Sequence, residues 1–233
     1  MKFALASFLT LGIIIGAVAD RYLPLAALLH GRLTDPAVLE VSRNHIEARA
    51  NFFQQSQSEA AVVMLGDSIT EYGGDWTELL GTPALNRGIA WDTVDGILVR
   101  LNEVIEKKPK IVAVMAGIND VRAGVPVDLV ASRIEQILTK LKAADVQPVM
   151  QSTLLTGTEL GEPATNKAII ALNRALSQWC AGQNVPFLDL NASLAPQGLL
   201  DPSITIDGIH LTDAGYLRWR DVLDPLLRRM LDS

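Results

Sequence analysis

The sequence contains a single cysteine, Cys180, so no disulfide can form within the chain. It contains three histidines, and no Cys/His spacing typical of a zinc site is present. There is no run of lysine or arginine, and the formal net charge is −6, so binding to nucleic acid has no electrostatic support. Internal repeats and low-complexity tracts are also absent. We therefore expect no metal and no nucleic-acid partner, and we predict that Cys180 is a buried, inert thiol.

The longest stretch without a charged residue is Phe3 to Ala19. A cleaved signal peptide is one interpretation, because Ala17 and Ala19 have the small-x-small form of a cleavage site. An uncleaved anchor is another, since about 17 residues is the short end of the range that spans a bilayer. A soluble hydrophobic helix is the least favoured, because no polar face is visible. We expect residues 1–30 to be a membrane anchor or signal segment, with membrane attachment through residues 3–19.

Such a segment implies a catalytic domain that is membrane-anchored or exported, to the periplasm or the extracellular space. The basic residues on its two sides are too balanced to set its orientation. After it, Asp35 and Pro36 form a helix-start signal, and residues 31–58 are expected to be a helical lead-in. The polar stretch 54–58 is typical of a linker, so the catalytic domain is predicted to cover 59–233.

Short apolar runs alternate with helical patterns through the rest of the chain. The runs are typical of strands buried on both faces of a parallel sheet. They lie at 61–65, 83–86, 111–115, 148–154 and 186–190. The amphipathic patterns between and after them predict helices at 94–105, 129–141, 166–181 and 212–226. The alternation predicts a three-layer α/β/α domain with a mainly parallel, roughly five-stranded sheet. In such folds, functional sites form at the carboxyl ends of the strands.

Four groups of residues fall at these strand ends or in the matching loops. Ser68, Gly88 and Asn119 follow the first three predicted strands, and Asp207 and His210 precede the last helix. Taken singly, each has a structural interpretation as a helix cap, a turn glycine or an Asx turn. A serine, an imidazole and a carboxylate that fixes the imidazole tautomer are, however, the groups that nucleophilic acyl transfer needs. Their combination at one edge of the sheet indicates catalysis.

In this order the residues resemble the SGNH hydrolases, also called GDSL-like lipases and acylhydrolases. The family's blocks match Gly66-Asp67-Ser68, Gly88, Gly117-Ile118-Asn119-Asp120 and Asp207-Gly208-Ile209-His210. The resemblance covers roughly residues 60 to 230. Around Gly88 the sequence is most similar to the small acetylesterases, including members that resemble platelet-activating-factor acetylhydrolase.

The resemblance implies a flavodoxin-like SGNH hydrolase fold, an esterase activity and no cofactor. It implies Ser68 as the nucleophile, His210 as the general base and Asp207 as its orienting acid. The oxyanion donors would be the backbone N–H of Ser68, the backbone N–H of Gly88 and the side chain of Asn119. The only partner implied is a small-molecule ester substrate, and the sequence does not set the oligomeric state.

Two positions depart from the family pattern. Many relatives have glycine where this chain has Trp91, and many have threonine where it has Ile118. Neither position supplies a catalytic side chain, so the chemistry is expected to stand. Trp91 either lines the acyl or leaving-group pocket or is a core aromatic. Asp67 is interpreted as a residue that shapes the nucleophile loop and borders the substrate pocket.

We expect the substrate to be a short-chain carboxylic ester, with O-acetyl groups of carbohydrates favoured. A lysophospholipase or thioesterase acting on longer acyl chains is the alternative within hydrolases. Transfer of the acyl group to an alcohol would use the same triad. A non-catalytic glycan-binding module of the same fold is the alternative from another class of protein.

Overall fold

The structure is a computed structural model that describes residues 36–160 and 163–232. It divides into two compact units, residues 1–44 and 45–233. The fold and the site described below belong to the second unit. The predicted anchor or signal segment, and with it the predicted N-terminal hydrophobic helix, lies outside the described residues. Within the described residues, no helix has both the length and the apolar character needed to cross a bilayer.

Strands and helices alternate along the described chain. The strands are β1 (Val62–Gly66), β2 (Ala84–Gly88), β3 (Ile111–Met115), β4 (Gln147–Gln151) and β5 (Phe187–Leu188). The helices are α2 (Pro36–Gln55), α3 (Ser68–Glu71), α4 (Trp76–Leu80), α5 (Val94–Glu106), α6 (Ile118–Arg122), α7 (Val127–Ala143), the 3-10 helix η1 (Thr158–Leu160), α8 (Pro163–Gln183), α9 (Asn191–Leu194) and α10 (Asp213–Leu231).

The strands form one parallel sheet of five strands in the order β2-β1-β3-β4-β5. The predicted α/β domain with a parallel five-stranded sheet is confirmed. Gly66 at the end of β1 pairs with Gly88 of β2 on one side and Met115 of β3 on the other. The carboxyl ends of these three strands are therefore level. Loops that leave them converge at one edge of the sheet, as sites in this class of fold require.

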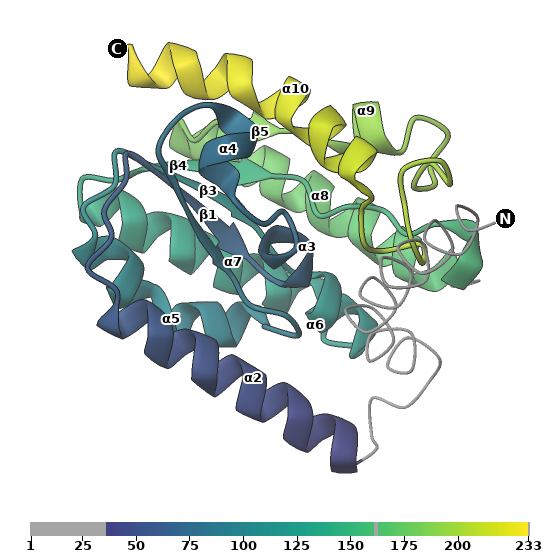
Figure 1. Ribbon diagram of the computed structural model, residues 1–233. Coiled ribbons are helices and arrows are strands. Elements are labelled where there is room, and N and C mark those ends of the chain that lie inside the picture. The colour runs from purple at the N-terminus through teal and green to yellow at the C-terminus, as the bar shows by residue number, and fades with distance from the viewer. Residues whose placement is uncertain (1–35, 161–162, 233) are drawn as a thin grey trace, which may run out of the picture. The chain divides into compact units, whose positions relative to one another are not determined.

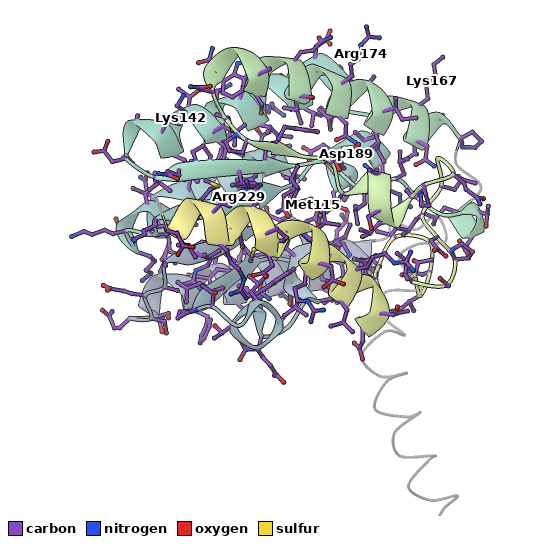
Figure 2. The ribbon with its side chains drawn as sticks, turned by 90° about the horizontal axis from the view of Figure 1, so that it is seen from above. Met115, Lys142, Lys167, Arg174, Asp189 and Arg229 are labelled. Atoms are coloured by element: carbon purple, nitrogen blue, oxygen red, sulfur yellow. The ribbon has the colours of Figure 1, made fainter. Side chains whose placement is uncertain are left out.

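Helices cover both faces of the sheet (Figure 1): α5, α7 and α8 lie together on one face, and α10 with α4 lies on the other. The apolar stripe of α5, with Ile97, Leu101 and Val104, is fully buried against the sheet side. On α8, by contrast, Figure 2 shows that the charged side chains of Lys167 and Arg174 point away from the sheet. This two-sided burial explains why β1 and β3 are continuous apolar runs.

The strand predicted at 148–154 ends earlier, at Gln151. Beyond it, asparagine side chains from the neighbouring helices take over the backbone hydrogen bonds. Asn173 accepts the N–H of Thr153 at 2.8 Å, and Asn191 accepts the N–H of Leu155 at 2.9 Å. Side-chain acceptors that satisfy a buried backbone make a partner strand unnecessary, and the apolar pattern alone does not reveal them.

The second half of α2, from His45 onward, belongs to the same compact unit as the sheet. Its residue Phe53 is 2% exposed and lies beneath the guanidinium groups of Arg87 and Arg49, at 4.5 and 5.0 Å from the ring centre. Cation–π contacts of this kind stabilise a buried guanidinium. This differs from the predicted boundary, which assigned residues 31–58 to a separate lead-in.

The lone cysteine, Cys180, lies in α8 and is fully buried, as predicted. Burial raises the pKa of its thiol to about 11, and the nearby carboxylate of Glu135 acts in the same direction. A thiol with a raised pKa is a poor nucleophile at neutral pH. The reactive groups of this chain therefore have to be sought elsewhere.

Candidate active site

The loop after β1 presents Ser68 at the first turn of α3. A side chain at Gly66 would clash with Thr70 and with the carbonyl oxygen of Met115, so only glycine fits at the end of the strand. Asp67 then caps α3, because its Oδ1 accepts the N–H of Ile69 at 3.0 Å. The turn places Ser68 at the carboxyl edge of the sheet, 6% exposed.

The loop before α10 contains His210, whose ring is hydrogen-bonded to the carboxylate of Asp207. Both oxygens of that carboxylate have hydrogen-bond partners. Asp207 Oδ1 accepts the N–H groups of Ile209 and His210, at 2.9 and 2.8 Å. Its Oδ2 lies 2.7 Å from Nδ1 of the His210 ring. On the other side of that ring, Nε2 lies 3.0 Å from Oγ of Ser68. The structure thus joins Ser68 to His210, 142 residues later in the sequence, and to Asp207 in one hydrogen-bonded chain.

The carboxylate of Asp207 is kept ionised by its partners. Burial opposes ionisation, but the hydrogen bond and charge interaction with the His210 ring, together with the two backbone N–H groups, outweigh it and lower the pKa of Asp207. An ionised carboxylate fixes Nδ1 as the protonated nitrogen, which leaves Nε2 free to accept a proton from Ser68. The ring of Tyr72 lies beside the imidazole, with 5.3 Å between ring centres.

Asn119 lies on α6, directly after β3, and points to the same edge. Its Nδ2 donates a hydrogen bond to the carbonyl oxygen of Asp92 at 2.9 Å. A carboxamide nitrogen carries two hydrogens, so a second one stays available to a ligand. The contact also ties α6 to the loop that follows β2.

The remaining predicted donor, the N–H of Gly88, lies at the end of β2. The N–H of Gly88 already donates to Oδ1 of Asn86 at 2.9 Å, so it is engaged within the protein. A side chain at Gly88 would clash with the backbone of Thr70 and Glu71. The structure therefore gives Gly88 a different task, the close packing of β2 against α3, and offers no support for it as an oxyanion donor.

Trp91, three residues further on, has a backbone N–H that is not engaged in this way. Its backbone has φ of +65°, the left-handed region, and its N–H has no hydrogen-bond partner in the described part of the chain. The neighbouring N–H groups are engaged, that of Ala90 with Glu71 Oε2 at 2.6 Å and that of Asp92 with the oxygen of Ile89 at 3.1 Å.

A bulky residue in this conformation costs about 1–3 kcal/mol, so surrounding contacts must hold it. The glycine that many relatives have at position 91 was the available signal, since a recurrent glycine often marks a positive φ. The indole of Trp91 is half-buried and makes an edge contact with His45, 5.5 Å between ring centres. Its assignment as a pocket residue stays a prediction.

Arg100 of α5 links the ends of β1 and β2 to the loop that follows β2. Its guanidinium pairs with Asp92 at 2.8 Å and donates to the carbonyl oxygens of Gly66 and Arg87, at 3.1 and 3.0 Å. Burial raises the pKa of Asp92, while Arg100 acts to lower it. Among the described residues, no group of three or more His, Cys, Asp or Glu side chains is arranged to hold a metal ion.

Asp67 is fully buried, and this raises the pKa of its carboxyl to about 7, with the nearby Asp92 and Asp120 acting in the same direction. When the pKa of a carboxyl is higher in the folded state than in the unfolded state, the protein loses stability as pH rises toward the folded-state pKa. We therefore expect the Tm of the wild-type protein to fall between pH 5 and pH 8.5 more steeply than that of Asp67→Asn, which keeps the capping oxygen. Thermal unfolding of both proteins across this range is the measurement. Parallel Tm curves would contradict the prediction.

Comparison with known proteins identifies a matching family and solved structures of the same fold. A model of the GDSL-like Lipase/Acylhydrolase family matches residues 64–218, more than half of the chain. A GDSL-like lipase from Bacteroides thetaiotaomicron has the same fold, with a TM-score of 0.65 and 24% identity over 81% of this chain and 97% of that one. A protein from Streptococcus pneumonia, described as a candidate platelet activating factor protein, gives a TM-score of 0.72 and 24% identity over 84% and 97%.

The acetylxylan esterase Axe2 from Geobacillus stearothermophilus gives a TM-score of 0.62 and 20% identity, over 74% of this chain and 94% of that one. Among curated proteins, an N-acylneuraminate cytidylyltransferase from Streptococcus agalactiae is 25% identical over 182 residues. That match covers 78% of this chain and 42% of the relative, so the chain spans less than half the length of the curated relative.

The chain belongs to the GDSL-like lipase/acylhydrolase family. The family is one of lipases and acylhydrolases, and in this chain Ser68, His210 and Asp207 form one hydrogen-bonded chain. The predicted family resemblance is therefore confirmed.

Proposed function

We propose that this protein hydrolyses short-chain carboxylic esters through an acyl-enzyme formed on Ser68. The observation that carries the proposal is the continuous hydrogen-bonded chain from Ser68 Oγ to His210 Nε2, 3.0 Å, and from His210 Nδ1 to Asp207 Oδ2, 2.7 Å. These are the contacts that a serine nucleophile, its general base and the orienting acid require.

In the first step Ser68 Oγ attacks the ester carbonyl carbon while His210 Nε2 takes the hydroxyl proton. The imidazolium that forms is stabilised by the ionised Asp207, whose other oxygen is fixed by two backbone N–H groups. When the C–O bond breaks, His210 returns the proton to the leaving alcohol. A water molecule then attacks the acyl-enzyme, with His210 again as the base, and releases the acid.

The oxyanion of the tetrahedral intermediate needs preorganised donors. We assign this role to the backbone N–H of Ser68, the second amide hydrogen of Asn119 and the backbone N–H of Trp91. The N–H groups of Ser68 and Trp91 have no hydrogen-bond partner within the described part of the protein. The Trp91 N–H takes the place that the sequence assigned to Gly88.

Acetyl groups on carbohydrates are the substrate class we favour. The neighbours support it, because Axe2 is an acetylxylan esterase and the curated relative is named for an acylated sugar acid. A transferase that passes the acetyl group to an alcohol would use the same residues and would show as a dependence on added acceptor.

A second candidate, hydrolysis of longer acyl chains as in a lysophospholipase or thioesterase, has one structural observation in its favour. A mainly apolar cleft of about 460 Å³ lies beside the catalytic loop, lined by Gly157, Ile170 and Leu199 among others. Gly157 joins it to that loop, since its N–H donates to the oxygen of Gly208 at 2.7 Å. An acyl chain of medium length would find apolar surface there.

Asn119→Ala is expected to lower kcat for an acetyl ester by about 10²–10³, because one oxyanion donor is lost. KM should change little, since the donor acts on the charge that develops in the transition state. Steady-state kinetics with p-nitrophenyl acetate measure the effect. The Tm of the variant controls for the lost contact to Asp92, and a kcat within threefold of wild type would remove Asn119 from the oxyanion site.

The proposal as a whole is tested by p-nitrophenol release from acetyl, butyryl and octanoyl esters, with the full chain and Ser68→Ala side by side. Acetyl turnover that disappears in Ser68→Ala supports the short-chain esterase. A preference for the octanoyl ester moves the assignment to longer acyl chains. If no ester, including acetylated sugars, is hydrolysed in a Ser68-dependent way, the esterase proposal fails and a glycan-binding module becomes the better account.

A further inference from the structure

The half of α2 that belongs to the catalytic unit places two polar side chains against the end of α3 and the end of β2. His45 Nε2 lies 3.0 Å from Glu71 Oε2, and Arg49 Nε donates to the carbonyl oxygen of Gly88 at 3.0 Å. The two residues are four apart, so they lie on the same face of the helix. Both fall outside the residues that the family model matches, 64–218.

Glu71 connects this helix to the backbone of the loop. Its Oε2, which faces His45, also accepts the N–H of Ala90 at 2.6 Å, and its Oε1 lies 3.4 Å from Nε of Arg49. The Glu71 side chain is only 11% exposed, so these contacts are partly shielded from water. Ala90 directly precedes Trp91, whose N–H is the assigned oxyanion donor.

His45 acts on Trp91 from a second direction. Its ring meets the indole edge-on, with 5.5 Å between ring centres and 90° between planes. Trp91 has a positive φ, a conformation that glycine adopts freely and tryptophan does not. The hydrogen bond from Ala90 to Glu71 fixes the residue before Trp91, and the ring contact with His45 fixes the indole.

We infer that His45 is a positioning residue for the oxyanion site, and that α2 is part of the esterase machinery in this chain. The inference rests on the proposed function, because it assigns a task to the donor loop of that mechanism. It explains how a tryptophan can stand where many relatives have glycine: the support that glycine does not need comes from a helix outside the residues that the family model matches.

The test is a set of variants of the full chain assayed with p-nitrophenyl acetate. His45→Ala is expected to lower kcat by about 10-fold to 30-fold, a fraction of the 10²–10³ that loss of an oxyanion donor costs, with KM within twofold of wild type. His45→Gln keeps an N–H donor for Glu71 and should recover part of the loss. Glu47→Ala, an exposed position on the same helix, is the matched control and should retain wild-type kinetics.

The decisive comparison repeats His45→Ala in a Trp91→Gly background. Glycine adopts the required φ unaided and has no ring for His45 to hold, so the second substitution should then cost at most about twofold. Circular dichroism and Tm establish that each variant is folded.

Three outcomes would overturn the inference: His45→Ala indistinguishable from Glu47→Ala, a loss confined to KM, or the same loss in both backgrounds. These remain distinct from failure of the proposed function, in which the wild-type chain itself shows no Ser68-dependent hydrolysis. If Ser68→Ala is inactive while His45→Ala is fully active, the esterase stands and only the role of His45 is lost.

Discussion

The His210→Ala variant is expected to lose about 10⁴–10⁶ in kcat toward any ester the wild-type protein hydrolyses. Without the imidazole, no group accepts the proton of Ser68 during attack and none returns it to the leaving alcohol. Nε2 of His210 lies 3.0 Å from the serine oxygen. Initial rates with p-nitrophenyl acetate, corrected for spontaneous hydrolysis, measure the loss.

The catalytic loop itself should survive this substitution. The backbone oxygen of His210 accepts hydrogen bonds from Ile206 N–H and Thr205 Oγ1, at 2.9 and 2.8 Å, and alanine retains that oxygen. Ile206→Ala, an exposed position in the same loop, is the matched control and should keep its activity within about twofold. A His210→Ala protein with more than a few per cent of wild-type kcat would mean that another residue is the base.

Asp207→Asn is expected to lower kcat by about 10³–10⁴. The amide that replaces Oδ2 cannot accept the Nδ1 proton of His210, so the imidazole loses both its tautomer and its stabilised charge. Asn retains one oxygen that can accept the N–H groups of Ile209 and His210, and the loop should therefore keep its shape. Kinetics between pH 6 and pH 9 provide the measurement.

The effect of the same substitution on the free energy of unfolding depends on pH. The pKa of Asp207 is lowered in the folded protein, so its contribution is present at neutral pH and is lost as pH falls through that pKa. Asp207→Asn should therefore be less stable than wild type near pH 7, and the difference should shrink toward pH 3. Activity that returns to wild-type levels at high pH would contradict the assigned role of Asp207.

The parallel sheet, and the edge at which the candidate site residues meet, could be predicted from the sequence because local signals determine them. Apolar runs such as residues 111–115 match the observed strand at both ends. Ser68 and Asn119 lie in the first turns of α3 and α6, directly after β1 and β3, and parallel strands carry their carboxyl ends to one edge. The end of β4 was missed because asparagines of α8 and α9 satisfy the backbone beyond it, which the apolar pattern does not reveal.

The oxyanion loop could not be predicted in detail, since it depends on contacts between distant segments. The side chain of Asn86 accepts the N–H of Gly88, whereas the N–H of Trp91 has no hydrogen-bond partner among the described residues. His45 and Arg49, which hold the loop, come from a helix that the apolar pattern assigned to a separate lead-in. Only the glycine of relatives at position 91 pointed to a positive φ there.

The central claim, that Ser68 is the nucleophile, is tested most directly by covalent labelling with a p-nitrophenyl alkylphosphonate, followed by intact mass and peptide mapping of the full chain. We expect a single adduct on Ser68, and loss of esterase activity in step with labelling. The adduct should be absent from Ser68→Ala and should form much more slowly in His210→Ala. An adduct on another residue, or full inhibition with Ser68 unmodified, would contradict it.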